Sequence, residues 1–114
     1  MPESESTDFA SPLGVDEFIS SLQDRWGVSY DIQLVTRDRR LYLQVMWAYL
    51  EQQSFPLDAV AYKLHLAKVL DVINRLGLSQ EVRNWLANTP KKPRVGRALS
   101  LQLKTNQCLD EFVL

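Results

Sequence analysis

The chain has 114 residues, of which 46% are hydrophobic and 24% are charged, and this composition is ordinary for one globular domain. Its formal net charge of −1, from 13 basic and 14 acidic residues, excludes a strongly cationic nucleic-acid binder of the histone kind. The single cysteine, Cys108, excludes an intramolecular disulfide and fits a reducing compartment, and no apolar run reaches the roughly 18 residues of a membrane span.

The first twelve residues, 1–12, are acidic and rich in Ser and Pro. They lack the basic and apolar regions of a secretory signal, so we expect a disordered acidic tail. Apolar residues then recur at three- and four-residue spacing from Val15 to Trp26, which predicts a helix over that segment. Gly27 is placed to end this helix in the left-handed conformation.

Apolar and polar residues next alternate over residues 30–35 and again over 41–47, which predicts an antiparallel hairpin. Both apolar rows reach the same face only if the loop has an even number of residues, two (38–39) or four (36–39). Neither loop contains Gly or Asn, so we favour four residues over a tight two-residue turn. The apolar row of the second strand is expected to be Leu41, Leu43, Val45 and Trp47.

Two more helices and a third strand follow along the chain. Asp58 is expected to cap a long helix over residues 59–76, and Ser79 a shorter one over residues 80–88. Leucines alternate with polar residues over 99–103, which predicts a strand with one apolar face.

These elements predict an α+β fold with the order α-β-β-α-α-β, in a single domain over residues 13–104 with a C-terminal tail at 105–114. A lone hairpin is marginal in water, so we expect the third strand to join the same small sheet. Helices would pack on one face of this three-stranded sheet. The opposite face would display Tyr42 and Gln44 among other polar side chains.

Candidate catalytic residues are scarce. His65, the only histidine, lies mid-helix, where we interpret it as a surface or half-buried structural residue, and Cys108 lies in the unassigned tail. One His and one Cys cannot complete a tetrahedral zinc site, and no glycine-rich phosphate-binding motif occurs. We therefore predict no catalytic residue, no metal and no cofactor, and an enzyme that uses His65 is the weakest hypothesis.

A basic loop precedes the third strand, with Lys91, Lys92, Arg94 and Arg97 around Gly96. Such a loop can bind a phosphate, another anion or RNA. A solvated loop with no ligand explains the same residues, and we favour that simpler interpretation.

The segment 41–56 is rich in aromatic side chains. Tyr42, Trp47 and Tyr49 lie there beside Gln44, a combination typical of recognition surfaces. The same residues are also what a small core requires, so packing and partner binding are equally supported.

Three blocks, RWGVSYDIQL, LYLQVMWAYLEQQSFP and KPRVGRALSL, occur in the order and spacing of a known family. On these blocks the chain resembles the uncharacterised family called domain of unknown function 3067, over about residues 16–103, with departures at Ala48, Gln53 and Lys92. That family occurs in cyanobacteria and in plastids. The resemblance implies a phototroph source and a cytoplasmic location, stromal in plastid relatives, and no known activity, so no residue role is carried over.

The leading hypothesis is a non-enzymatic protein-binding or assembly accessory module for an unidentified protein partner. Its binding surface would be the open sheet face with Tyr42 and Gln44, together with the basic loop. The alternative is an RNA- or anion-binding module that uses the loop at 91–97.

Overall fold

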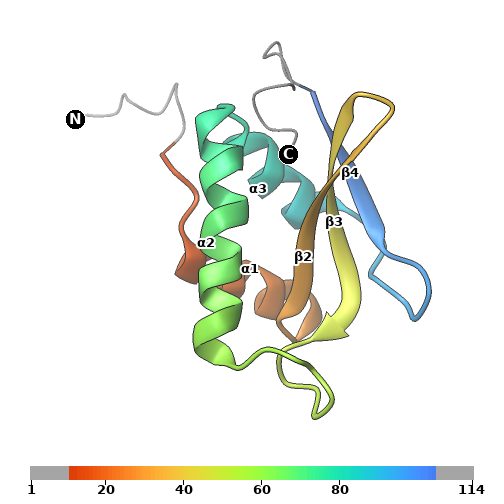
Figure 1. Cartoon of the computed structure of the whole chain (residues 1–114). Coiled ribbons are helices and arrows are strands. Elements are labelled where there is room, and N and C mark those ends of the chain that lie inside the picture. The colour runs from red at the N-terminus through yellow and green to blue at the C-terminus, as the bar shows by residue number, and fades with distance from the viewer. Residues whose placement is uncertain (1–10, 105–114) are drawn as a thin grey trace.

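The computed structural model describes residues 11–104 and confirms the predicted α+β order (Figure 1). Residues 1–10 of the tail predicted over 1–12, and the whole tail predicted over 105–114 with Cys108, lie outside the described residues. The last two residues of the N-terminal tail are described, and the carbonyls of Ser11 and Pro12 accept hydrogen bonds from Ser79 and Arg83. The elements are α1 (Val15–Trp26), β2 (Tyr30–Arg37), β3 (Arg40–Tyr49), α2 (Ala59–Arg75), α3 (Ser79–Asn88) and β4 (Leu99–Leu103).

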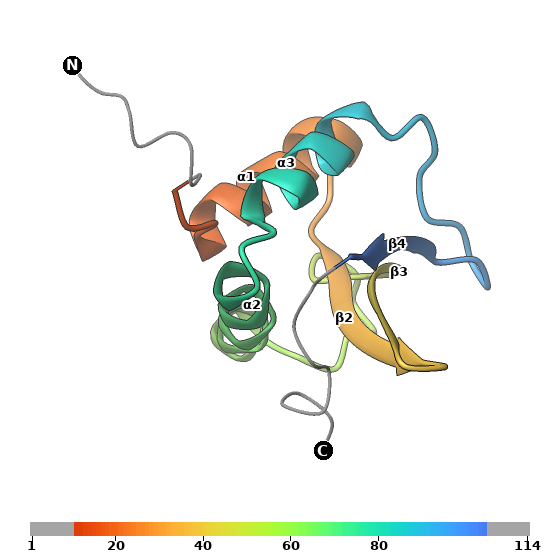
Figure 2. The ribbon, with the colours of Figure 1, turned by 90° about the horizontal axis from the view of Figure 1, so that it is seen from above.

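The three strands form one antiparallel sheet in the order β2-β3-β4, so β4 joins the hairpin as predicted. Seen from above, α1 and α3 lie together over one side of the sheet, and α2 runs beside β2 (Figure 2). The core lies between these layers, where Phe18, Ile32, Leu43, Leu66 and Val82 are fully buried. All three helices therefore leave the opposite face of the sheet uncovered.

The hairpin loop has two residues, Asp38 and Arg39, and the prediction of four was wrong. Arg37 pairs with Arg40, and the two loop residues have φ angles of 53° and 66°. Left-handed backbone at both loop positions is what a two-residue hairpin needs to match the twist of its strands. Asp tolerates this conformation, and the regular pairing of the strands outweighs its cost at Arg39.

The apolar row of β3 ends at Val45, so the inward placement predicted for Trp47 was wrong. Ile32 pairs with Val45 but Tyr30 pairs with Tyr49, so β3 carries two extra residues at this irregularity. Such a bulge breaks the inside–outside alternation. Trp47 is half-buried and lies outside the set of side chains that pack against the described core.

The helix ends follow the predicted capping at α2 but not at α3. Asp58 accepts a hydrogen bond from the Ala61 N–H at 2.8 Å, as expected of an N-cap. Ser79 lies inside α3 instead of capping it, and its hydroxyl donates to the Ser11 carbonyl at 3.2 Å. The prediction of Ser79 as an N-cap was therefore wrong, because its hydroxyl instead binds the segment before α1. Among residues 11–104, no helix is both long and apolar enough to cross a membrane.

Candidate binding surface

The uncovered side of the sheet carries the residues that strand alternation turns away from the helices. We call this surface the outer sheet face; its described members are Gln33, Val35, Tyr42, Gln44, Met46, Ser100 and Gln102. Tyr42 lies between Val35 on β2 and Gln102 on β4. The Gln44 amide donates to the Ser100 hydroxyl at 3.2 Å, which ties β3 to β4 across this face. Predicted site residues Tyr42 and Gln44 therefore lie together on one surface.

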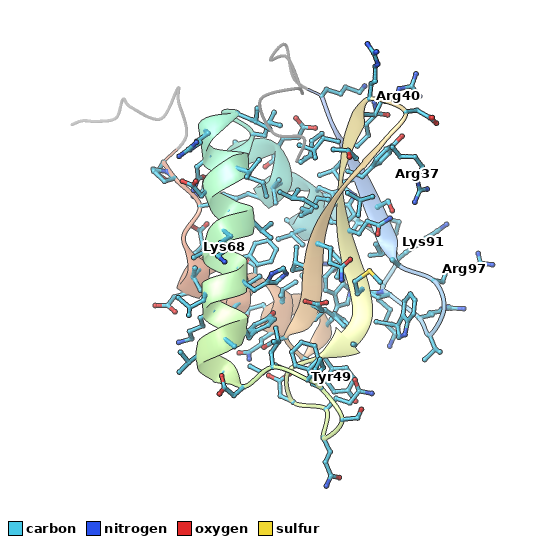
Figure 3. All side chains as sticks on the ribbon, viewed as in Figure 1. Arg37, Arg40, Tyr49, Lys68, Lys91 and Arg97 are labelled. Carbon is cyan, nitrogen blue, oxygen red and sulfur yellow. The ribbon has the colours of Figure 1, made fainter. Side chains whose placement is uncertain are left out.

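Basic side chains lie on two sides of the outer sheet face. Figure 3 shows Arg37 and Arg40 at the hairpin end, with Lys91 and Arg97 on the same side, whereas Lys68 lies on α2. Among residues 11–104, the ion pairs of Lys and Arg involve helix residues and none of the four rim cations. All 13 basic residues of the chain lie in this part, whereas five of the 14 acidic residues lie outside it. The described part therefore carries more basic than acidic residues, and within it none of these four cations forms an ion pair.

The predicted basic loop forms one wall of a groove of about 1030 Å³ between the end of α3 and the start of β4. Trp85 and Leu99 supply apolar lining, and no carboxylate from residues 11–104 lines the groove. Four cations without an acidic neighbour in this part of the chain favour an anionic ligand. The lining residues are Trp85, Thr89, Pro90, Lys91, Lys92, Arg94, Arg97, Ala98, Leu99 and Ser100.

The tip of the basic loop is a tight turn with defined geometry. Arg94 and Arg97 exchange two backbone hydrogen bonds, at 3.1 and 2.7 Å, and Gly96 supplies the left-handed φ of 80° between them. Val95 at the turn is 89% exposed, whereas Pro93 is buried. The turn therefore holds the backbones of both arginines beside each other at the mouth of the groove.

Arg25 of α1 fixes the other end of this loop. Its Nε donates to the Leu86 carbonyl at 2.8 Å and its guanidinium also donates to the Thr89 carbonyl. These carbonyls belong to the last turn of α3 and to its C-cap residue, where carbonyls have no helical partner. The groove is thus anchored to the body of the protein at the point where α3 ends.

Tyr49 and Trp47 occupy different surroundings from the other predicted site residues. The Tyr49 ring meets the Tyr30 ring edge to face, with centroids 6.0 Å apart, and packs against the core. Tyr49 is labelled at the far end of β3, away from the cations Arg37 and Arg40 (Figure 3). The geometry therefore favours packing for Tyr49, while half-buried Trp47 lies near the irregularity of β3.

His65 lines neither of the two described grooves. Its Nε2 lies 2.5 Å from the Ile32 carbonyl and 3.7 Å from the Asp31 carboxylate, so it joins α2 to β2. It is half-buried, as the sequence predicted. Within residues 11–104, no group of three or more His, Cys, Asp or Glu side chains could hold a metal ion.

A second, smaller groove of about 350 Å³ lies between α1 and α3. Arg83 bridges it by donating to Glu17 at 2.6 and 3.0 Å and to the Pro12 carbonyl at 3.0 Å. The hydrogen bond from Arg83 holds the pKa of Glu17 below its usual value, and the same contact raises the pKa of Arg83. This groove is occupied by an ion pair that fastens the start of the domain, so we interpret it as structural.

Sequence reasoning missed several residues of the surface. Trp85 was not among the predicted site residues, yet it both packs against the core and lines the groove. Arg37 and Arg40 were not among the predicted site residues either, although their cluster with Arg39 is visible in the sequence. Ser100 belongs both to the outer sheet face and to the groove, and only the pairing of β4 with β3 reveals this.

The family model for a domain of unknown function, DUF3067, matches residues 16–113. The chain belongs to the DUF3067 family. This confirms the resemblance found in the three sequence blocks. No curated protein matches the chain.

The fold also occurs in a solved structure of a cyanobacterial protein. The solution NMR structure of the Alr2454 protein from Nostoc sp. strain PCC 7120 is similar to this chain, with 35% identity and a TM-score of 0.79. The similarity covers 90% of this chain and 98% of the Nostoc chain. The DUF3067 fold and a cyanobacterial relative are thus established, and neither comparison supplies an activity.

Proposed function

We propose that this DUF3067 protein is a non-enzymatic binding module that recognises an acidic segment of a partner protein. The observation that carries the proposal is the presence of cations on two sides of a sheet face that no helix covers, Arg37 and Arg40 at the hairpin end and Lys91 and Arg97 beside β4. Complementary charge steers association and selects partners of the opposite sign. Tyr42 and the glutamines of the face add apolar contact and hydrogen bonding for a peptide chain.

A titration of the 15N-labelled protein with a blocked deca-glutamate peptide tests this proposal. We expect amide shifts to map to the outer sheet face and the basic loop, and to shrink steeply with added salt. The double variant Arg94→Ala with Arg97→Ala should weaken binding at least about tenfold. The control Lys68→Ala with Arg75→Ala removes the same charge from α2 and should leave binding nearly unchanged. Equal losses in both variants, or no binding at low salt, would contradict the proposal.

A second candidate function is binding of RNA or another phosphate-bearing anion in the groove. It is favoured by one specific observation, the indole of Trp85 beside the four cations. Bases stack on aromatic rings while phosphates pair with Lys and Arg. Titration with a ten-nucleotide oligo(U), followed by Trp fluorescence and by the shifts of Trp85, distinguishes this candidate. Tighter binding of oligo(U) than of deca-glutamate would favour nucleic acid.

We further propose a cytoplasmic location in a phototroph, with a stromal location for plastid relatives. The support is membership of DUF3067 and the cyanobacterial relative. A fluorescent fusion expressed in a cyanobacterium tests the location. Accumulation in the periplasm or the thylakoid lumen would contradict it.

A further inference from the structure

The two edges of the sheet differ in how their backbone groups are satisfied. β2 and β4 are both terminal strands in the order β2-β3-β4, so each has one edge without a strand partner. Unpaired edges are sites where another chain can add a strand, and natural proteins cover or interrupt them. Whether another element covers an edge therefore indicates whether a further strand can pair with it.

The edge of β2 is covered by α2. Tyr62 donates its hydroxyl to the Tyr30 carbonyl at 2.7 Å, and His65 lies 2.5 Å from the Ile32 carbonyl through Nε2. Both side chains come from α2 and meet the backbone of β2. The half of this edge at Tyr30 and Ile32 is consequently closed to an added strand.

The hydrogen-bonding pattern of the hairpin determines which backbone N–H and C=O groups of β4 point toward β3 and which point away from it. A two-residue loop is closed by a hydrogen-bonded pair, here Arg37 with Arg40, and bonded pairs then alternate along the strands. Residues 40, 42 and 44 thus bond to β2, and residues 41, 43 and 45 bond to β4. The free carbonyl of Ile32, taken by His65, agrees with this alternation.

It follows that Leu99, Leu101 and Leu103 bond to β3, because they pair with Val45, Leu43 and Leu41. The backbone N–H and C=O groups of Ser100 and Gln102 then point away from β3, toward the free edge of β4. Within residues 11–104, no backbone group of another element bonds to them. The strand has five residues and contains no proline or charged side chain that would interrupt pairing.

The basic groove adjoins this free edge. Its lining includes Leu99 and Ser100 of β4, the Trp85 ring from α3 and the four loop cations. Figure 2 shows the loop leaving α3, arching outward and returning to β4. An unpaired strand edge, an apolar wall and uncompensated positive charge therefore meet in one place.

We propose that an extended acidic segment of the partner protein adds to the sheet along the free edge of β4. Its backbone pairs with Ser100 and Gln102, and its carboxylates meet Lys91, Lys92, Arg94 and Arg97. Main-chain hydrogen bonds supply affinity in such strand addition, and side chains supply selectivity. This inference rests on the proposed function, since it uses the same cations. A second copy of this chain fits less well, because pairing β4 with β4 would bring like charges together.

A proline substitution tests strand addition. Ser100→Pro removes an outward N–H and keeps the ladder to β3, a position where edge strands accept proline. It should weaken binding of a blocked decapeptide of alternating Glu and Thr by about tenfold or more. Ser100→Ala keeps the backbone N–H and removes only the hydroxyl, so it measures the side-chain contribution and should lose clearly less affinity than Ser100→Pro. A copy of the peptide that is N-methylated at alternate residues has the same charge but fewer backbone donors. It should bind the wild-type protein about as weakly as the unmethylated peptide binds Ser100→Pro.

Hydrogen exchange in the unmodified protein provides a test that needs no variant. The amides of Ser100 and Gln102 should exchange quickly in the free protein and at least about tenfold more slowly with the peptide bound. The amide of Leu101, already bonded to β3, serves as the internal control and should change little. This measurement decides the question if Ser100→Pro fails to fold.

The outcomes separate this inference from the proposed function. If the peptide binds wild type and Ser100→Pro equally and leaves both amides unprotected, strand addition is wrong while acidic recognition stands. If the peptide does not bind at low salt, both are wrong. Protection of Ser100 and Gln102 that appears with protein concentration alone, with a dimer in sedimentation, would overturn the inference in favour of self-pairing. Tighter binding of oligo(U), displacing the peptide, would overturn it in favour of nucleic acid.

Discussion

Glu51 accepts hydrogen bonds from both the backbone N–H and the hydroxyl of Ser29, at 2.8 and 2.9 Å. Ser29 is fully buried, and Gln23 of α1 donates to the same hydroxyl at 2.9 Å. The contact joins the loop after β3 to the junction of α1 and β2. The carboxylate thereby accepts the buried backbone N–H and hydroxyl proton of Ser29, which would otherwise lack an acceptor.

We expect Glu51→Ala to lower the free energy of unfolding by about 2 kcal/mol, because it leaves the N–H and hydroxyl of Ser29 short of an acceptor. Glu51→Gln keeps one acceptor oxygen and should cost about 1 kcal/mol. Urea unfolding followed by fluorescence measures both values. Gln53→Ala, an exposed change in the same loop, is the control and should stay within about 0.5 kcal/mol of wild type. Equal stability of Glu51→Ala and the control would contradict the structural role.

The pH dependence of the free energy of unfolding should reflect the titration of two carboxylates, Glu17 and Glu51. The hydrogen bond from Arg83 lowers the pKa of Glu17 below 4.5. Burial raises the pKa of Glu51, but the hydrogen bonds from Ser29 and Gln23 together outweigh it and lower the pKa below 4.5. A carboxylate with a lowered folded pKa stabilises the protein above its unfolded pKa, and this stability is lost as the pH falls through the folded value.

The double variant Glu17→Gln with Glu51→Gln should therefore lose less stability than wild type as the pH falls from about 5 to about 3. Both carboxylates are partly exposed, so solvent screening keeps the difference to about 1 kcal/mol or less for each. Urea midpoints at a series of pH values measure it. Parallel curves for the two proteins would show that neither group is linked to folding.

Tyr62 should stabilise the contact of α2 with β2 through its hydroxyl. The side chain is fully buried, donates to the Tyr30 carbonyl at 2.7 Å and has a raised pKa, caused mainly by burial. Tyr62→Phe leaves that carbonyl without its donor and should cost about 1–2 kcal/mol in unfolding free energy. Tyr42→Phe, on the outer sheet face, is the matched control and should change stability by less than about 0.5 kcal/mol.

The two-residue hairpin loop predicts a stabilising substitution. Arg39 has a φ of 66°, a conformation that costs an ordinary residue about 1–2 kcal/mol and costs glycine nothing. Asp38→Asn with Arg39→Gly should therefore raise stability by about 0.5–1 kcal/mol, after the greater freedom of glycine in the unfolded chain is subtracted. Thermal and urea unfolding measure it. Arg40→Gly, which places glycine within β3, should be destabilising, and a stabilised Arg40→Gly would argue against this loop.

Arg25 should be needed for the shape of the basic groove. It donates to the Leu86 and Thr89 carbonyls at the end of α3. Arg25→Ala should lower stability by about 1 kcal/mol and shift the amides of residues 89–98, because the last turn of α3 loses its donors. Arg75→Ala removes an exposed charge that pairs only within α2 and should affect neither quantity. Unshifted loop amides in Arg25→Ala would contradict the anchoring role.

The local elements could be predicted because their causes are local. Apolar spacing in the segment from Val15 to Trp26 gives the first helix, and a carboxylate at Asp58 caps the second. Alternation over β2 and β3 gives the hairpin and places Tyr42 and Gln44 on the face away from the helices. The three family blocks likewise stand in the sequence itself, and the family match confirms them.

Other features depend on contacts between distant segments, and sequence reasoning failed there for that reason. Ser79 looks like a cap, but its hydroxyl is taken by Ser11, 68 residues away. In the sequence, Trp47 continues the alternation of apolar and polar residues. In the structure, two extra residues in β3 break this alternation where Tyr30 and Tyr49 pair. The two-residue turn was rejected for want of glycine, although strand pairing outweighs the local cost at Arg39.

The sequence by itself determined the order of elements, the family and the existence of a basic loop. Only the tertiary structure decided where that loop lies, because its position depends on how β4 pairs with β3 and how Arg25 holds the end of α3. Tyr62 and His65 cover the β2 edge at Tyr30 and Ile32, whereas no backbone group from residues 11–104 pairs with the β4 edge at Ser100, beside the groove. Periodicity within a segment reflects its own burial, whereas neighbouring strands and edges are set by packing across the whole domain.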